Sequence, residues 1–489
     1  MRRTARDNLF WYRFLPWAVG TAAFFSASSL LFRMLWFDEV LTVNLLMKLP
    51  FPRIYFAYEI PNNHIVFTLL EKVWYGTVSA IAGFPYYCFR LVPMFCGAAA
   101  IVLLTRKLIR CCGLPAGTLA AGCFAVSCVY ALFATAVRGY MTGFLLTVLA
   151  VLCAENVVRL GRRRDFLLYF LLTLLSVGTA PTNLAALAAV VLYFLPSGIR
   201  RGGHRMRRVI FLAAAPCLAL LFFYLPIADK FIGCIRLGEG WHSASSAIYV
   251  CYTGMLFPLI GLLPFCAAGA FFIWRKIPRL RLNCICGLLI LLLPMAAYGI
   301  LKVPPFPRVF FPLSAVWLFL AAHAMTGFLH LFRKRKNAAA AVLLIAAAAC
   351  SFFLQSRMEA AGSFLYDRDG RGDDYIAPYY ARASFVPNKL LEYLKEKYRK
   401  EGEFRVFATF DSDAPSLVFA GMIADFPEGV LLADALNRPK TLRLQDYPGE
   451  KYIICAGEAD LEQTLRRFGL RSAVLEKKYG LQHLYRVRE

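Results

Sequence analysis

Long apolar runs, each near the length that crosses a bilayer, recur through residues 1–356. A helix of about 20 residues spans the hydrocarbon core of a membrane. The pattern predicts eleven spans, centred on residues 14–33, 87–105, 115–134, 140–158, 166–180, 182–197, 209–227, 248–272, 284–301, 309–329 and 338–356. The runs at 166–180 and 182–197 are short, and the Gly-Thr-Ala-Pro-Thr-Asn sequence of residues 178–183 predicts a hairpin break between them.

Clusters of basic residues between these runs predict the orientation of the chain. They hold 24 of the 34 Lys and Arg residues of the membrane block, and they lie at residues 2–13, 106–110, 159–164, 200–208, 275–281 and 333–336. With eleven spans, all six clusters fall on one side, which the positive-inside rule makes cytoplasmic. We therefore expect an integral protein, of the bacterial plasma (inner) membrane, with a cytoplasmic N-terminus and an exported C-terminus.

The first exported loop, residues 34–86, contains an apolar run at 64–84 that we do not count as a span. This run includes Glu71 and Lys72, and charges at mid-membrane are costly. Counting it would also move the basic cluster 106–110 to the exported side. The pattern therefore predicts an interfacial helix that lies on the exported face of the membrane.

Residues 357–489 alternate between helical and strand patterns and predict a small exported α/β domain, the second domain after the membrane domain 1–356. A charged amphipathic helix is expected at 387–400 and a second helix at 461–468. Strands are expected at 404–410, 429–432, 452–455, 473–475 and 484–487. Nothing in this block resembles a nucleotide-binding loop.

Composition excludes an ordinary soluble protein and a disordered one, because 59% of the residues are hydrophobic, 17% are charged and the mean hydropathy is +0.56. The C-terminal block carries 21 basic and 21 acidic residues, so the whole net charge of +25 lies in residues 1–356. Membrane topology explains that excess better than nucleic-acid binding does. The 15 cysteines lie mostly singly in apolar stretches, and no repeated CxxC pair predicts a zinc site.

Two adjacent carboxylates, Asp38 and Glu39, directly follow the first span. A partly buried carboxylate in this position could act as a general base on an acceptor hydroxyl or amine. The alternative is an acidic pair at a helix end that is solvated at the membrane interface.

Several cations are expected on the exported side, where the positive-inside rule disfavours them. Arg138 ends the third span and Tyr140 opens the fourth, while Lys302 and Arg308 flank a proline-rich turn before the tenth. Converging cations could hold an anionic lipid head group, and the arginine fork suits phosphate. The alternative is that each side chain extends from a helix end towards the interface. His64 precedes the interfacial helix, and no histidine shows metal-ligand spacing.

These residues together resemble the GT-C glycosyltransferases, closest to the protein O-mannosyltransferase and lipid A aminoarabinose transferase group. Residues 36–39 (Trp-Phe-Asp-Glu) and 62–64 (Asn-Asn-His) are similar to the first exported loop of that group. Residues 89–93 (Phe-Arg-Leu-Val-Pro), 136–140 (Ala-Val-Arg-Gly-Tyr) and 307–312 (Pro-Arg-Val-Phe-Phe-Pro) are similar to its "RLPS", "ARxY" and "RYxxP" segments. The ordered match covers roughly residues 10–330.

The resemblance implies a transferase that moves a sugar, a hexose or a pentose, from a polyprenyl-phosphate carrier to a glycan, lipid or protein acceptor. Asp38 matches the catalytic carboxylate of the family, with Glu39 beside it. His64, Arg138, Tyr140, Lys302 and Arg308 match substrate-binding positions, with the cations facing the donor phosphate. The second loop lacks the additional carboxylate of some relatives, so we expect no cofactor and no metal, although a divalent cation is an alternative.

Two other classes of function are open on sequence grounds. A ligase or polymerase of lipid-linked glycans would share the exported basic site, but not the Asp-Glu pair directly after the first span. A lipid or polysaccharide transporter would be expected to show internal repeats and broken helices at mid-membrane. The sequence shows no repeat, and its ionisable residues are expected at one face and not at the midplane.

Overall fold

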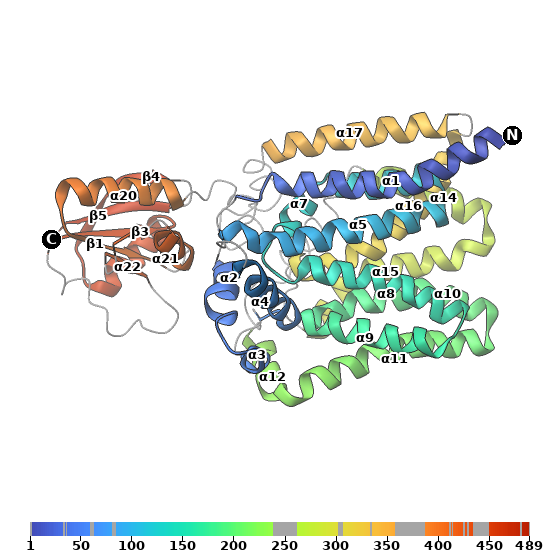
Figure 1. Ribbon diagram of the computed structural model, residues 1–489, viewed down its shortest axis with the longest axis horizontal. Coiled ribbons are helices and arrows are strands. Elements are labelled where there is room, and N and C mark those ends of the chain that lie inside the picture. The colour runs from blue at the N-terminus through green and yellow to red at the C-terminus, as the bar shows by residue number, and fades with distance from the viewer. Residues whose placement is uncertain are drawn as a thin grey trace. The chain divides into compact units, whose positions relative to one another are not determined.

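The computed structural model divides the chain into two compact units (Figure 1): Met1–Leu31 with Leu49–Ser356, and Phe32–Lys48 with Arg357–Glu489. It describes all residues except 1, 33–34, 36, 59–62, 81–84, 238–261, 302–306, 333–334, 357–386, 410–411, 413, 424–425, 428–429, 434–448, 480–481 and 489.

The first unit is a bundle of long helices with short connections (Figure 1). Its α-helices are α1 (Arg2–Ser28), α3 (Phe51–Phe56), α4 (Ile65–Ser79), α5 (Leu91–Cys112), α6 (Leu114–Ala125), α7 (Cys128–Ala134), α8 (Tyr140–Arg159), α9 (Arg163–Thr179), α10 (Leu184–Arg201), α11 (Gly203–Tyr224), α12 (Ala228–Leu237), α14 (Leu263–Lys276), α15 (Arg281–Leu301), α16 (Ser314–Leu329) and α17 (Lys336–Ser356). Short 3₁₀-helices include η2 (Tyr86–Arg90), η3 (Pro181–Asn183), η7 (Pro307–Leu313) and η8 (His330–Phe332).

Among the described residues, six helices are long and apolar enough to cross a membrane, and the chain is an integral membrane protein. Large apolar side chains point outward along the bundle, as a lipid-facing surface requires: Phe25, Leu167, Ile210 and Phe222 are each at least 59% exposed. A helix lies in each of the eleven predicted runs, although only the second part of the run 248–272, as α14, is described. The count of eleven crossings stays a prediction.

One of the predicted runs is interrupted, and the break between two others lies where it was predicted. The run 115–134 is divided into α6 and α7 at Val126 and Ser127, where the Ser127 hydroxyl accepts a hydrogen bond from the Tyr130 amide at 3.1 Å and so caps α7. The predicted hairpin break at 178–183 is confirmed, because α9 ends at Thr179 and η3 begins at Pro181.

The apolar run 64–84 forms α4, whose 15 residues are fewer than a span needs. The two charges of this run have different surroundings. Glu71 is fully buried, whereas the Lys72 ammonium donates to the Leu49 carbonyl at 2.8 Å. Burial raises the pKa of Glu71 well above its usual range. The position of α4 on the membrane surface stays a prediction.

The second unit contains α2 (Phe37–Val40), the π-helix η1 (Leu41–Leu46) and the C-terminal domain. In the C-terminal domain the helices are α20 (Pro387–Glu401), α21 (Ala414–Ile423) and α22 (Glu458–Phe468). The strands are β1 (Phe404–Ala408), β2 (Leu431–Ala433), β3 (Glu450–Cys455), β4 (Ser472–Tyr479) and β5 (Gln482–Arg488). The predicted α/β class is confirmed, and α21 is an addition to the predicted elements.

The described strands form one sheet in the order β2-β1-β3-β5-β4. β1 pairs in parallel with β2 and β3, while β5 is antiparallel to β3 and β4. Phe407, Ile453 and Tyr485 are in register on one face and pack with Leu461 and Phe468 of α22. Because α20 covers the opposite face at Phe404, β1 and β3 are buried on both sides, which explains why apolar residues stand next to one another at 406–408 and 452–455.

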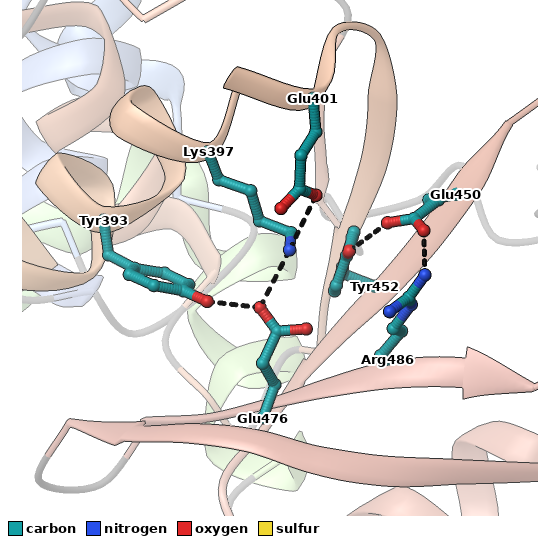
Figure 2. A network of polar contacts seen from close by, with 7 residues as sticks. All are labelled: Tyr393, Lys397, Glu401, Glu450, Tyr452, Glu476 and Arg486. Atoms are coloured by element: carbon teal, nitrogen blue, oxygen red, sulfur yellow. Dashed lines mark hydrogen bonds and ion pairs between the residues drawn. The ribbon is translucent and has the colours of Figure 1, made fainter. Parts of the chain in front are cut away.

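A polar network ties α20 to the sheet (Figure 2). The Lys397 ammonium lies 2.8 Å from a Glu401 carboxylate oxygen and 3.1 Å from one of Glu476, and it lies over the Tyr452 ring. Tyr393 donates to Glu476 as well. Burial alone would lower the pKa of Lys397, but its hydrogen bonds to these carboxylates and to Tyr452 outweigh burial and raise it. This network connects α20 to β3 and β4 within the C-terminal domain.

Candidate functional site

The candidate site is built on the short turn that joins α7 to α8. Residues 135–138 form a bend between the two helices, and all four are buried. The Thr135 hydroxyl donates to the Ala131 carbonyl at 2.9 Å, and the Arg138 amide donates to the Ala136 carbonyl at 2.7 Å. These bonds fix the backbone immediately before Tyr140.

Arg138, Tyr140 and His64 meet at this turn. The ring centroids of His64 and Tyr140 are 5.1 Å apart in an edge-to-face arrangement, and the Arg138 guanidinium carbon lies 5.9 Å from the Tyr140 centroid. Gly139 allows this approach, because a Cβ there would lie 2.6 Å from the His64 Nδ1 atom and 2.6 Å from the Thr179 methyl group. A larger residue at position 139 would push His64 away from the turn.

Arg308 reaches the same group of residues from η7, which is far away in sequence. Its positive charge contributes to the lowered pKa of His64. Aromatic rings connect their elements: Phe311 of η7 lies 4.4 Å from Phe133, and Phe133 lies 5.4 Å from Tyr140, centroid to centroid. The aromatic contacts therefore fix η7 against the turn that carries Arg138.

The electrostatics of the site are those of a buried cationic pocket. Arg138 and Arg308 are 2% and 9% exposed, and His64 is buried beside them. Burial lowers the pKa of His64 well below its usual range, and the positive charges of Arg138 and Arg308 lower it further. The imidazole is therefore neutral at physiological pH. Its Nδ1 atom has no hydrogen-bond partner among the described residues.

The segment before α4 holds His64 in place. The Asn63 amide donates to the carbonyls of Ile54 at 2.7 Å and Ala57 at 2.9 Å, and its oxygen accepts from the Thr68 hydroxyl at 3.2 Å. One side chain thus joins α3 to the first turn of α4. A buried amide with three partners fixes the backbone on which His64 begins the helix.

Sequence reasoning missed Arg90 as a site residue, although it lies in a segment that resembles the family. Arg90 is fully buried, and its guanidinium donates to the Thr135 carbonyl, at the start of the turn that carries Arg138. Tyr58 was missed as well. Burial raises the pKa of Tyr58, the nearby Arg138 charge opposes that rise, and the Tyr58 ring packs on Tyr224.

Asp38 and Glu39 belong to the second unit, where they lie on α2. Both are buried, at 8% and 0% exposure, and the Thr42 hydroxyl donates to the Asp38 carbonyl at 3.0 Å. They are therefore not a solvated acidic pair. Within this unit α2 packs against α21 of the C-terminal domain. Lys302 lies outside the described residues.

The arrangement in the first unit has the chemistry of an anion site. It brings the buried guanidinium groups of Arg138 and Arg308 together with the side chains of His64 and Tyr140. A phosphate would meet two cations, a phenol and a neutral imidazole here, and guanidinium groups bind phosphate bidentately. Among the described residues, no group of three or more His, Cys, Asp or Glu side chains is placed to hold a metal ion.

The fold of the chain is the GT-C glycosyltransferase fold. ArnT from Cupriavidus metallidurans bound to undecaprenyl phosphate matches 96% of this chain over 96% of its own, with a TM-score of 0.53 and 13% sequence identity. The apo structure of the same protein matches 95% of this chain over 96% of its own, with a TM-score of 0.50 and 13% identity. No family model and no curated protein matches the sequence. At 13% identity the similarity establishes the fold, and the predicted fold class is confirmed.

Proposed function

We propose that the chain is a membrane glycosyltransferase that transfers a sugar from a polyprenyl-phosphate carrier to an acceptor hydroxyl or amine on the exported face. One observation carries the proposal: Arg138, Arg308, His64 and Tyr140 form a buried cationic site in a chain with the fold of ArnT, whose structure binds undecaprenyl phosphate. Two guanidinium groups suit the phosphate of such a carrier, because each can bind it bidentately.

The proposed reaction is a single displacement at the anomeric carbon. The acceptor oxygen or nitrogen attacks that carbon, and Asp38 takes the proton that the acceptor loses. The bond between the anomeric carbon and the phosphate oxygen breaks, and its electron pair stays on the departing polyprenyl phosphate. Attack opposite to the leaving group inverts the anomeric centre. Glu39, next to Asp38, supports the base in this scheme.

The cations act on the leaving group. The negative charge on the phosphate rises as the bond to the sugar breaks, so Arg138 and Arg308 stabilise the transition state more than the bound donor. Lys302 is proposed as a third cation. The neutral His64 can donate a hydrogen bond from one ring nitrogen and accept one with the other, which suits a sugar hydroxyl or a phosphate oxygen. Tyr140 supports Arg138 through its ring.

No metal enters this scheme. Guanidinium groups do the work that a divalent cation does in other phosphate sites, so we expect turnover to survive a chelator such as EDTA. Loss of turnover in EDTA, with recovery on adding Mg²⁺ or Mn²⁺, would indicate instead that Asp38 and Glu39 bind a divalent cation.

The experiment offers the purified chain a panel of polyprenyl-phosphate hexoses and pentoses together with acceptors. Released polyprenyl phosphate and the glycosylated product are measured. At least one donor should yield both in equal amounts, and Arg138→Ala should lower the yield. Binding of lipid-linked glycans without cleavage would instead indicate a transporter, and transfer of preassembled oligosaccharides alone would indicate a ligase.

A further inference from the structure

Helices α14 and α16 make an unusually close contact. A Cβ atom on Gly269 would lie 1.9 Å from the Ala324 carbonyl oxygen, and one on Gly327 would lie 2.6 Å from the Gly269 carbonyl oxygen. Small residues at such a crossing let two backbones touch inside a membrane. Large side chains follow on both helices directly after the crossing.

A groove of about 610 Å³ opens beyond this contact, where α14 ends and η8 follows α16. It is lined by Phe272, Lys276, Ile277, His330 and Leu331. The rings of Phe272 and His330 are 5.8 Å apart, centroid to centroid. The groove therefore combines an aromatic and aliphatic wall with an ammonium and an imidazole.

The surroundings of the groove are basic. Arg275 and Arg279 are exposed beside Lys276, and the sequence contains no Asp or Glu from residue 240 to residue 358. Arg281 lies over the Trp274 ring and donates to the Trp274 carbonyl at 3.1 Å. Lys276 and Ile277 belong to the basic cluster 275–281, and in the sequence His330 and Leu331 directly precede the cluster 333–336. Both clusters are on the side of the membrane that the sequence predicts to be cytoplasmic.

We propose that this groove binds the head group of an anionic phospholipid. The phosphate would meet Lys276 and His330, and the first carbons of the acyl chains would lie along Ile277 and Leu331, which are 39% and 57% exposed. Basic pockets between membrane helices on the cytoplasmic side are suited to such head groups. A soluble anion would gain nothing from the exposed aliphatic wall, so the lipid is the better fit.

The test uses the full chain purified in a neutral detergent. Native mass spectrometry measures retention of phosphatidylglycerol and of phosphatidylcholine with the same acyl chains. The chain should retain the anionic lipid preferentially. Lys276→Gln should weaken its binding about fivefold, the change expected from one basic residue at an anionic lipid surface. An exposed residue at a helix end tolerates this substitution, so folding should be unaffected.

The matched control is Arg207→Gln, which removes the same charge from an exposed position on α11 outside the groove. It should leave binding unchanged. Equal losses in both variants would show that only net charge matters and would overturn the proposal, as would equal retention of the two lipids. Displacement of the lipid by millimolar glycerol phosphate would indicate a site for small anions and would also overturn it. None of these readouts depends on glycosyl transfer.

Discussion

Removing the Arg138 side chain should weaken binding of the lipid phosphate. Arg138 is 2% exposed and lies on the Tyr140 ring, so its guanidinium is fixed and shielded from water. A hydrogen bond to a charged group contributes about 1.5–3 kcal/mol. Arg138→Ala should therefore reduce the affinity for polyprenyl phosphate about 10–100-fold and slow turnover as well. Arg138→Lys should recover only part of the loss, because the ammonium keeps the charge without the planar fork.

The assay is equilibrium binding of a fluorescent polyprenyl phosphate to the purified chain. Arg164→Ala is the matched control, because that side chain is 74% exposed and lies at the start of α9, outside the candidate site. It should bind the lipid like the unchanged protein. A folded Arg138→Ala protein with unchanged affinity would refute the phosphate site.

A double-mutant cycle with Arg308 tests whether both arginines hold the same phosphate. Arg308→Ala alone should also lower affinity about 10–100-fold, by the same reasoning. If the two side chains share one ligand, their losses should not add, and the coupling should exceed the few tenths of a kcal/mol seen for independent sites. Additive losses of binding free energy would indicate that the two arginines do not contact the same phosphate.

Three further predictions concern the elements around the site. Because the pKa of His64 is lowered in the folded chain, an unfolded chain binds more protons below about pH 6.5. Stability should therefore fall as the pH drops below that value. Thermal unfolding between pH 5 and 7.5 should show this loss in the unchanged protein and not in His64→Gln. The same dependence of unfolding temperature on pH in both proteins would contradict the prediction. Arg90→Met leaves the buried Thr135 carbonyl without this donor, so it should cost about 1–3 kcal/mol of stability and also weaken lipid binding, with partial rescue by Arg90→Lys. A loss of stability with intact lipid binding would limit Arg90 to a structural role. A topology reporter fused after Ser356 should be exported and one after Arg281 cytoplasmic, whereas an exported reporter after Arg281 would overturn the eleven-span count.

Periodicity was sufficient to predict a helix that has one buried face. The charged amphipathic pattern predicted α20 within one residue at its C-terminal end. The strands β1, β3 and β5 also lie where they were expected, and the apolar residues of β1 and β3 indicated them. Helix α21 was missed for the opposite reason. Its sequence, Ala-Pro-Ser-Leu-Val-Phe-Ala-Gly-Met-Ile, has no polar face. Without alternating polar and apolar positions the sequence shows no helical periodicity, although the segment is a helix.

Cations are conspicuous on the side of a membrane protein that the sequence predicts to be exported, and Arg138 and Arg308 were selected for that reason. His64 was selected from the resemblance of residues 62–64 to the family. The contacts that bring the elements of these residues together join distant segments, so the sequence does not reveal them. Arg90 bonds to a backbone carbonyl 45 residues away, and a backbone partner leaves no trace in the sequence. The rings that connect η7 to α8 are likewise ordinary core residues until the fold brings them together.

The central claim, that Asp38 is the base of a transfer from a lipid phosphate, is tested most directly in a single turnover. The purified chain and its Asp38→Asn variant are loaded with a polyprenyl-phosphate sugar, acceptor is added, and release of polyprenyl phosphate is followed. Asparagine has nearly the same size but cannot take the proton, so the variant should bind the donor as tightly and release it about 10²–10⁴-fold more slowly. Release at the unchanged rate by Asp38→Asn would contradict the account.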